Sequence, residues 1–301
     1  MRVRVWGPVL ALTLLVSGCS AVTLRGTAEP GLSVAPATPA QAPTTTTPTT
    51  TTTVPVTTTT EAPPPDFQPA IKNAVAAVPD GHVAVAVWDT VTSTMVGTYR
   101  DTAQYYTESV VKLLIGLDVL DHGGDASKVA EMLSRSDDAT ASAFWGEYGT
   151  NSIVTTMAAK IGLSATVPPH NPKYWGDSRT TAADLVRVYR YILTVAPAAE
   201  RAVIIPALTA ATQHGADGND QWFGIPDAVG KTTSWAVKQG WGCCEPSWVL
   251  NTTGLVGKHD RYIVVLLVAF TSGDGDGDTI PSGHAAEVTA AARALVSDAA
   301  Q

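Results

Sequence analysis

Ser109 and Lys112 have the clearest potential for chemistry, because they form the single Ser-x-x-Lys pair between Asp66 and Gln301. On a helix, positions i and i+3 lie on the same face. An amine held there can accept the serine proton and make a weak nucleophile reactive. The apolar stretch after Lys112 places Ser109 at the start of a predicted helix, where backbone N–H groups stabilise a developing oxyanion. The pair therefore predicts nucleophilic acyl transfer.

Two further polar motifs follow in the chain. A Ser-Asp-Asp run occupies 136–138, just after a short predicted helix. A Lys-Gln-Gly-Trp run occupies 238–241, on a predicted strand. A Lys-Thr-Thr run at 231–233 is an alternative for this third motif. We favour Lys238, because Gly240 two places on would let a substrate backbone lie against the strand.

These three motifs, in this order, resemble the serine β-lactamase and penicillin-binding-protein superfamily, whose signatures are S-x-x-K, S-D-N and K-T-G. Residues 176–181 are also similar to the stretch that follows the omega loop of class A β-lactamases. The nearest resemblance is to β-lactamase-like lipoproteins of actinobacteria. The similarity extends from about residue 70 to the C-terminus, and it implies a serine hydrolase that needs no cofactor and no metal.

The resemblance also implies a role for each motif residue. Ser109 would be the acylated nucleophile, Lys112 its base and Ser136 the relay that protonates the leaving nitrogen. Lys238 would supply positive potential for a substrate carboxylate. The remaining positions implied to bind substrate are Asp138, Gln239, Gly240 and Trp241. The backbone N–H groups of Ser109 and Trp241 would form the oxyanion hole.

Three departures from the family pattern predict poor turnover of β-lactams. Asp138 replaces an Asn, and an ionised carboxylate accepts hydrogen bonds but donates none. Gln239 replaces the Thr hydroxyl that helps to hold a carboxylate. The omega region, 167–176, contains no Glu, so the base that activates the deacylating water in class A enzymes is missing. His170 lies in this region, and we interpret it as a loop residue.

The N-terminal segment reads as the export signal of a lipoprotein. Arg2 and Arg4 precede an apolar run that is too short to span a bilayer, and Val-Ser-Gly-Cys follows at 16–19. This resembles the bacterial lipobox, which implies a signal peptide at 1–18 and a lipid on Cys19. Residues 19–65 are rich in Thr and Pro and lack the large apolar side chains that offset chain entropy. They predict a disordered tether.

Residues 66–301 are long enough for one domain with its own core. The net charge of −8 excludes nucleic acid as a plausible partner. Cys243 and Cys244 are adjacent, and we interpret them as free thiols, with a vicinal disulfide as the alternative. The Asp- and Gly-rich run at 272–278 lacks the Gly and Glu that an EF-hand needs at its sixth and twelfth positions, so it predicts a solvated turn.

Apolar periodicity predicts helices at the two ends of this domain, strands early and late, and helices between them. The predicted helices are 66–78, 109–120, 127–133, one opened by a capping box at Thr181, and 285–299. The predicted strands are 83–87, 94–100, 234–239, 248–254 and 261–270. This order favours an α/β (α+β) fold of the β-lactamase and transpeptidase type. An antiparallel sheet would be flanked by the terminal helices and joined by a helical subdomain.

The sequence therefore predicts a monomeric serine hydrolase, held by lipid on the extracytoplasmic face of the cell membrane. The implied substrate is a D-alanyl cell-wall peptide or another small acyl compound. The alternative is a binding protein of the cell envelope that uses the same fold without turnover, since fold alone does not decide function.

Overall fold

The computed structural model describes residues 66–243, 247–271, 277 and 279–297, all of which belong to the compact unit Thr60–Gln301. The predicted signal peptide, Cys19, the tether and Cys244 lie outside the described residues, as does most of the Asp-rich run. None of the helices in the described part is long and apolar enough to cross a bilayer.

A five-stranded antiparallel sheet, in the order β2-β1-β7-β6-β5, forms the centre of the domain. Its strands are β1 (Gly81–Asp89), β2 (Thr94–Tyr99), β5 (Trp235–Gly242), β6 (Val249–Val256) and β7 (Tyr262–Phe270). All five were predicted from the sequence, with ends that differ by a few residues. The prediction of an antiparallel sheet in an α/β fold is confirmed.

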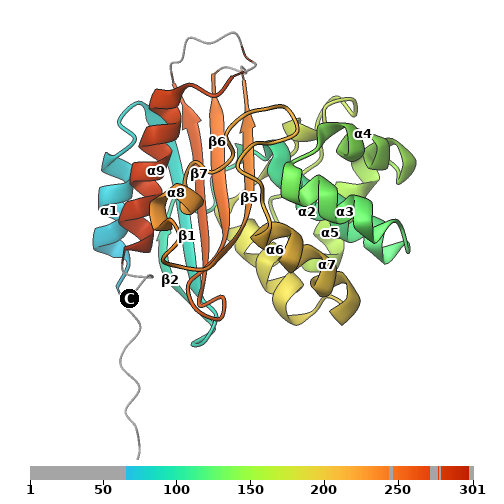
Figure 1. The fold of residues 1–301 in the computed structure, drawn as a ribbon, viewed down its shortest axis with the longest axis horizontal. Helices are drawn as coiled ribbons and strands as arrows, with labels where there is room; N and C mark the ends of the chain where they lie inside the picture. Colours follow the sequence, from blue (N-terminus) through green and yellow to red (C-terminus); the bar gives the residue numbers. More distant parts are fainter. Residues whose placement is uncertain (1–65, 244–246, 272–276, 278, 298–301) are drawn as a thin grey trace, which may run out of the picture. The chain divides into compact units, whose positions relative to one another are not determined.

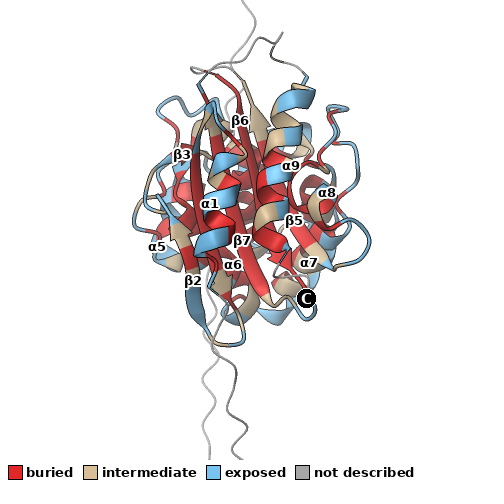
Figure 2. Cartoon of the chain, turned by 90° about the vertical axis from the view of Figure 1, so that its left-hand side faces the viewer, coloured by how far each residue is buried: buried red, intermediate tan, exposed pale blue. Residues whose placement is uncertain are grey.

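Helices cover both faces of this sheet, and the alternation of side chains along each strand divides the core in two. In β1, Ala84 and Ala86 pack towards the helical subdomain, whereas Val83 and Val85 pack towards the terminal helices. The central strand β7 is apolar almost throughout, because neither of its faces meets water. Figure 2 shows the inner strands as buried, with exposed residues on the edge strand β2 and on the outer faces of α1 and α9.

The helices form two groups (Figure 1). Those of the first group, on one face of the sheet, are α1 (Gln68–Ala76), α8 (Ile225–Val229) and α9 (Ser282–Val296). The second group makes up the helical subdomain: α2 (Lys112–Asp121), α3 (Ala126–Arg135), α4 (Asp138–Glu147), α5 (Asn151–Ile161), α6 (Ala182–Thr194) and α7 (Ala198–Thr209). The sequence prediction missed α4, α5, α7 and α8.

The predicted capping box at the start of α6 is present in part. The Thr181 hydroxyl accepts a hydrogen bond from the Asp184 N–H at 3.1 Å. The Asp184 carboxylate, however, accepts from the N–H groups of Ser164 and Ala165. It therefore anchors the chain that enters the omega region, instead of closing the box.

Two short strands hold the segment before Ser109 against the segment after the omega region. They are β3 (Tyr105–Tyr106) and β4 (Arg179–Thr180), which pair in antiparallel fashion. A two-residue strand has no sequence signal of its own, so its existence depends on tertiary pairing. The pairing therefore holds the end of the omega region beside the segment that leads to Ser109.

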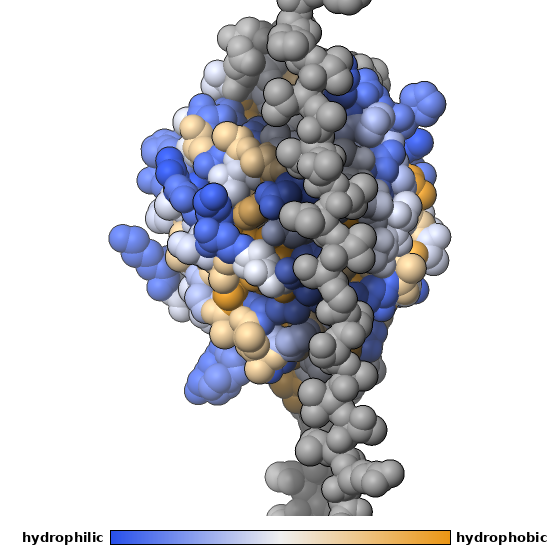
Figure 3. All heavy atoms as spheres, turned by 90° about the vertical axis from the view of Figure 1, so that its right-hand side faces the viewer, coloured by the Kyte–Doolittle hydropathy of each residue, from blue (hydrophilic) through white to orange (hydrophobic). Residues whose placement is uncertain are grey.

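The face of the molecule in Figure 3 mixes hydrophilic residues with small hydrophobic patches. Among the described residues, the exposed large apolar side chains are Val91, Met95, Tyr99, Val167, Tyr174 and Val195. They come from separate elements, and scattered apolar residues of this kind are normal on a surface that faces water. One of them, Tyr174, lines the candidate site.

Candidate active site

The Ser109–Lys112 pair lies where a short 3₁₀ helix, η1 (Glu108–Val111), continues into α2. Residues 112–119 of α2 are all buried, so the first turns of this helix lie in the core and Lys112 enters with them. The Lys112 Nζ atom lies 2.6 Å from the Ser109 Oγ atom, and Ser109 itself is 5% exposed. The i, i+3 geometry expected from the sequence is present.

The Ser-Asp-Asp run forms the junction between α3 and α4. Ser136 is the C-cap of α3 and adopts a left-handed conformation, with φ 53° and ψ 40°. Asp137 is the N-cap of α4, and its carboxylate accepts the N–H groups of Ala139 and Thr140. This double cap presents Ser136 to Lys112, whose Nζ atom donates to the Ser136 carbonyl at 2.9 Å and lies 3.2 Å from its Oγ atom.

Lys238 reaches the same serine from β5. Its Nζ atom donates to the Ser136 Oγ atom at 2.8 Å and to the Gln239 carbonyl at 2.9 Å, and the residue is 1% exposed. The Ser136 hydroxyl therefore lies between two lysine amines. The alternative residue Lys231 is exposed, in the turn before β5. We call Ser109, Lys112, Ser136 and Lys238 the floor of the site.

Burial changes the protonation of both lysines. It lowers the pKa of Lys112, against the opposing effect of the neighbouring Asp138 carboxylate. Burial also lowers the pKa of Lys238 well below its usual value, and the charge of Lys112 lowers it further. Both changes favour a neutral amine, which is the form that can accept a serine proton.

Gln239 does not join the site, which corrects its predicted role in substrate binding. Neighbouring residues on a strand point to opposite faces, so Gln239 faces the terminal helices when Lys238 faces the floor. Its amide donates to the Phe223 carbonyl at 2.5 Å. The family pattern has a carboxylate-binding hydroxyl at this position. Here the side chain is Gln239, which binds the Phe223 carbonyl and not a ligand in the cavity.

Gly240 lacks a side chain for a reason that the sequence did not reveal. A Cβ atom at this position would lie 2.6 Å from the Thr107 carbonyl oxygen and 3.0 Å from the Val110 side chain. The absence of a side chain therefore lets the start of η1 lie close to β5. This is a second reason for a small residue, beside the substrate contact expected from the sequence. Asn251 reinforces this approach, since its amide donates to the Tyr106 carbonyl at 2.9 Å.

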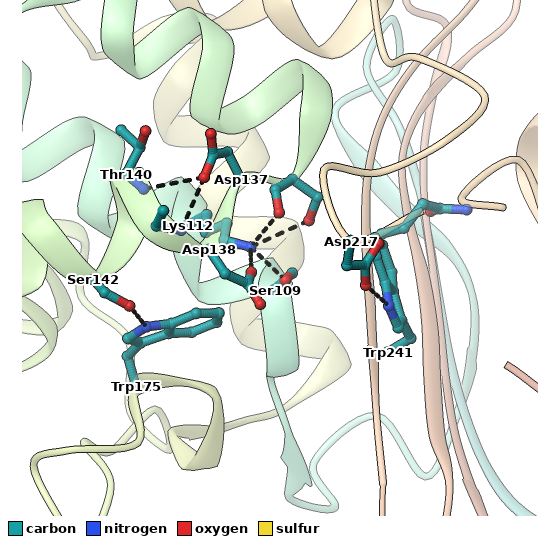
Figure 4. A network of polar contacts seen from close by, with 12 residues as sticks. Ser109, Lys112, Asp137, Asp138, Thr140, Ser142, Trp175, Asp217 and Trp241 are labelled. Carbon is teal, nitrogen blue, oxygen red and sulfur yellow. Dashed lines mark hydrogen bonds and ion pairs between the residues drawn. The ribbon is translucent and has the colours of Figure 1, made fainter. Parts of the chain in front are cut away.

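Trp241 lines the site with its ring, and its indole N–H donates to the Asp217 carboxylate at 2.9 Å. Two donors of Asn219, its backbone N–H and its side-chain amide, also bind Asp217. The sequence analysis missed Asp217, because it lies in a polar loop with no recognisable motif. Figure 4 shows Ser109 between Trp175 on one side and the Asp217–Trp241 pair on the other.

Asp138 and Lys112 form an ion pair, with 2.5 Å between the Oδ1 and Nζ atoms. The Asp138 side chain is 63% exposed, whereas Lys112 is fully buried. The carboxylate therefore lies at the boundary between the floor and the solvent. Its contact with the base was not expected from the sequence.

Glu108 is a further group that the sequence analysis missed. It adopts a left-handed φ of 46°, and a Cβ atom at Gly242 would lie 2.3 Å from its carboxylate. Burial, with Asp177 and Asp138 nearby, raises the pKa of Glu108 to about 8, although Lys112 opposes this. At neutral pH, Glu108 therefore holds a proton beside the nucleophile.

An open cavity of about 620 Å³ leads to Ser109. Carboxyl groups from four separate segments line it, and we call them the acidic wall: Glu108, Asp138, Asp177 and Asp217. Ser142, Lys173, Tyr174 and Trp175 also line the cavity, whereas His170 is exposed and is not among the lining residues. Among the described residues, no cluster of His, Cys, Asp and Glu is suited to hold a metal ion.

Cys243 also lines the cavity, and it is disulfide-bonded. The interpretation of this residue as a free thiol was therefore wrong. Adjacent cysteines on a strand were expected to point in opposite directions. The chain leaves β5 at Gly242, so Cys243 is not held in that pattern.

Comparison with known proteins gives sequence relatives and structural neighbours. The chain is 38% identical over 204 residues to proteins named "Putative lipoprotein LppW" in Mycobacterium tuberculosis (strain ATCC 25618 / H37Rv) and Mycobacterium bovis. The match spans 64% of this chain and 64% of each relative, which is slightly less than two thirds of their length. No family model matches the chain.

Three solved structures are similar in fold. A class A β-lactamase from Bacteroides cellulosilyticus DSM 14838 has a TM-score of 0.62 at 14% identity, covering 76% of this chain and 96% of its own. A β-lactamase from Streptosporangium roseum has 0.60 at 18%, covering 76% and 96%. PBP-A has 0.61 at 15%, covering 77% and 96%. The protein therefore has the fold shared by class A β-lactamases and PBP-A.

Proposed function

We propose that this protein is a membrane-anchored serine hydrolase that acts outside the cytoplasm and forms an acyl-enzyme on Ser109. The observation that carries the proposal is the 2.6 Å contact between the Lys112 amine and the Ser109 hydroxyl, inside a buried network. A serine beside an amine of lowered pKa has the arrangement that activates serine as a nucleophile. A mutant of PBP-A has been solved as an acyl-enzyme complex with penicillin G, which supports this reaction class.

The floor supplies each proton transfer of acylation. Lys112 accepts the Ser109 proton as the Oγ atom bonds to the substrate carbonyl carbon. The carbonyl oxygen becomes an oxyanion, which the N–H groups of Ser109 and Trp241 stabilise. The bond to the leaving group then breaks, and the leaving atom takes a proton from the Ser136 hydroxyl, which regains one from Lys112. Ser109 then carries an ester, and Lys112 is neutral again.

Deacylation requires water and a second proton acceptor. The omega region supplies no Glu, so Lys112 is the floor residue placed to accept the water proton as well. We therefore propose that hydrolysis of the ester is slow and that the acyl-enzyme persists. The substrate that fits this site is a cell-wall peptide, such as a D-alanyl peptide, or a related small acyl compound.

Covalent labelling tests the nucleophile. The wild-type protein is incubated with a fluorophosphonate or a fluorescent penicillin, and the intact mass of the protein is measured. An adduct that maps to Ser109 and is lost in Ser109→Ala supports the proposal. Labelling that survives in Ser109→Ala, with the thermal unfolding temperature unchanged, would show that another residue is the nucleophile.

A lipid anchor on Cys19 is the second part of the proposal. The lipobox-like sequence at 16–19 motivates it, and the names of the LppW relatives support it. Cys19→Ala should move the protein from the membrane pellet to the soluble or secreted fraction. Retention of that variant in the pellet would contradict lipid anchoring.

An envelope protein that binds without turnover is the second candidate, and the Lys112–Asp138 ion pair favours it. A carboxylate 2.5 Å from the amine stabilises the ammonium form, which accepts no proton. In that case neither probe would label the protein, although ligands would still bind in the cavity. The labelling experiment therefore separates the two candidates.

A further inference from the structure

Acidic side chains outnumber basic ones around the cavity at Ser109. The four carboxyl groups of the acidic wall come from η1, α4, η2 (Trp175–Asp177) and the loop before β5, so no single motif accounts for them. Among the described residues that line the cavity, the cationic side chain is Lys173. Lys112, beneath the cavity, is already paired with Asp138. Glu108 is protonated at neutral pH, so the negative charge that a ligand meets comes from Asp177 and Asp217, which outweigh the single charge of Lys173.

Asp217 holds its carboxylate in a fixed position beside the reacting centre. It accepts hydrogen bonds from the backbone N–H and the amide of Asn219 and from the indole of Trp241. Its charge reaches Lys112 and Lys238, since it acts on the pKa of each. An acceptor fixed by three donors costs little reorganisation when a cation approaches.

Aromatic rings on opposite sides of the cavity add a second attraction for cations. Trp175 is fixed by a hydrogen bond from its indole N–H to the Ser142 hydroxyl, and Trp241 by its bond to Asp217 (Figure 4). Tyr174 also lines the cavity and is 58% exposed. Indole and phenol faces attract ammonium and guanidinium groups. The centroids of the Trp175 and Trp241 rings already lie near amines of this chain, 4.7 Å from the Lys112 Nζ atom and 5.9 Å from the Lys238 Nζ atom, so a ligand cation would add to contacts of a kind that the site already makes.

The groups that would hold a carboxylate are occupied elsewhere. The Lys238 amine donates to Ser136 and to the Gln239 carbonyl, and it is almost completely buried. The Gln239 amide binds the Phe223 carbonyl on the opposite face of the sheet. A ligand carboxylate in this region would instead approach Asp217, and like charges in a partly enclosed site repel.

From these observations we infer that the cavity selects ligands that carry a positive charge, an ammonium or a guanidinium, near the reacting carbonyl, and that it rejects those with a carboxylate there. Asp217 is the specificity-determining residue. The inference rests on the function proposed above, and it narrows the substrate class. A peptide with a free amine near the cleaved bond fits the cavity better than one whose terminal carboxylate must be held.

The test uses three forms of one chromogenic cephalosporin that differ only at the ring carboxylate. They are the free carboxylate, the methyl ester and the 2-(trimethylammonio)ethyl ester. Binding to the Ser109→Ala protein is measured by calorimetry, so that no reaction intervenes. We expect affinity to increase from the anionic to the neutral to the cationic form, with at least a tenfold difference between the extremes, and to weaken as salt is raised.

A second variant assigns the preference to one residue. Asp217→Asn, made in the Ser109→Ala protein, keeps an acceptor for the Trp241 indole but removes the charge, so the preference for the cationic form should fall several-fold. Glu147→Gln, at an exposed position at the end of α4, is the charge-matched control and should change nothing. Equal affinity for all three forms, tighter binding of the carboxylate, or no measurable binding of the cationic ester would overturn the inference.

The wild-type protein separates this inference from the proposed function. If the Ser109→Ala protein prefers the cationic form but no form acylates wild-type Ser109, the charge selection stands and the acyl-transfer proposal fails. If the carboxylate form acylates Ser109 fastest, acyl transfer stands and the charge selection is wrong.

Discussion

The floor and the acidic wall lie in one cavity but differ in how they are built. The floor consists of two serines and two lysines, all buried, joined by hydrogen bonds of 2.6 to 3.2 Å. The acidic wall consists of carboxyl groups on four segments, and the two whose exposure is high, Asp138 and Asp217, face solvent. In our proposal the floor performs the chemistry, whereas the wall controls which molecules reach it and how Lys112 is protonated.

This difference shows why motif residues alone do not define the activity. The floor consists of residues from the three motifs that resemble the family signatures, so it predicts a reaction. The wall consists of carboxyl groups, whereas a substrate that carries a carboxylate needs positive charge or hydrogen-bond donors. We therefore expect changes in the floor to alter rate constants strongly, and changes in the wall to alter pH dependence and ligand choice.

The largest effect should follow removal of the floor amine. Lys112→Met keeps the volume of the side chain but removes the proton acceptor, so the rate of covalent labelling should fall by about 10²-fold to 10⁴-fold. In the wild type, labelling should slow as the pH falls through the lowered pKa of Lys112, because the amine becomes protonated. Stopped-flow labelling from pH 5 to pH 9 measures both effects. A labelling rate in Lys112→Met equal to that of the wild type would exclude Lys112 as the base.

Asp138→Asn tests the contact between wall and floor. Without the carboxylate, the pKa of Lys112 should fall further, so that more of the amine is neutral at pH 7. The Asn amide can also donate a hydrogen bond to a substrate carbonyl. Together these changes should raise the labelling rate by about tenfold. Slower labelling, with unchanged thermal stability, would mean that the ion pair positions Lys112 and that this role outweighs the effect on its pKa.

Glu108→Gln tests the wall through stability. The pKa of Glu108 is raised in the folded state. Its contribution to the free energy of unfolding is therefore fully present below the pKa of the unfolded state, and it is lost as the pH rises through about 8. The variant has no such loss. Its stability relative to the wild type should therefore increase between pH 5 and pH 8.5, by on the order of 3 kcal/mol.

Urea unfolding at pH 5, 7 and 8.5 measures this difference in the free energy of unfolding. Glu131→Gln, an exposed acid on α3, is the control and should show no such trend. A constant difference between Glu108→Gln and the wild type over this range would show that Glu108 titrates normally.

The smallest effect is expected at Gln239. In Gln239→Thr the family residue is restored, but the side chain at this position faces the terminal helices and not the cavity. Affinity for a carboxylate-bearing penicillin should therefore change by less than about threefold. A larger gain, measured by competition with the fluorescent probe, would mean that this position does reach the ligand.

The sequence alone determined the sheet, the terminal helices and the Ser-x-x-Lys helix, because their apolar patterns are long and periodic. The apolar character and length of the segments at 83–87 and 261–270 left few other assignments. The motif residues Ser109, Lys112, Ser136 and Lys238 were also identified from type and order, and the structure brings all four together. Elements such as β3 and β4 were missed, because two residues form a strand only when a partner segment is already in place.

The tertiary structure alone decided the character of the site. The sequence could not show that Gln239 turns away from the cavity, since that depends on the register of β5 against the floor. It gave no sign that Asp217 faces Trp241, or that the Glu108 carboxyl is enclosed beside Gly242. Charges that lie far apart in the chain interact only after folding brings them together. The residues of the floor are thus recognisable from short motifs in the sequence, whereas the charge of the wall is a property of the folded domain.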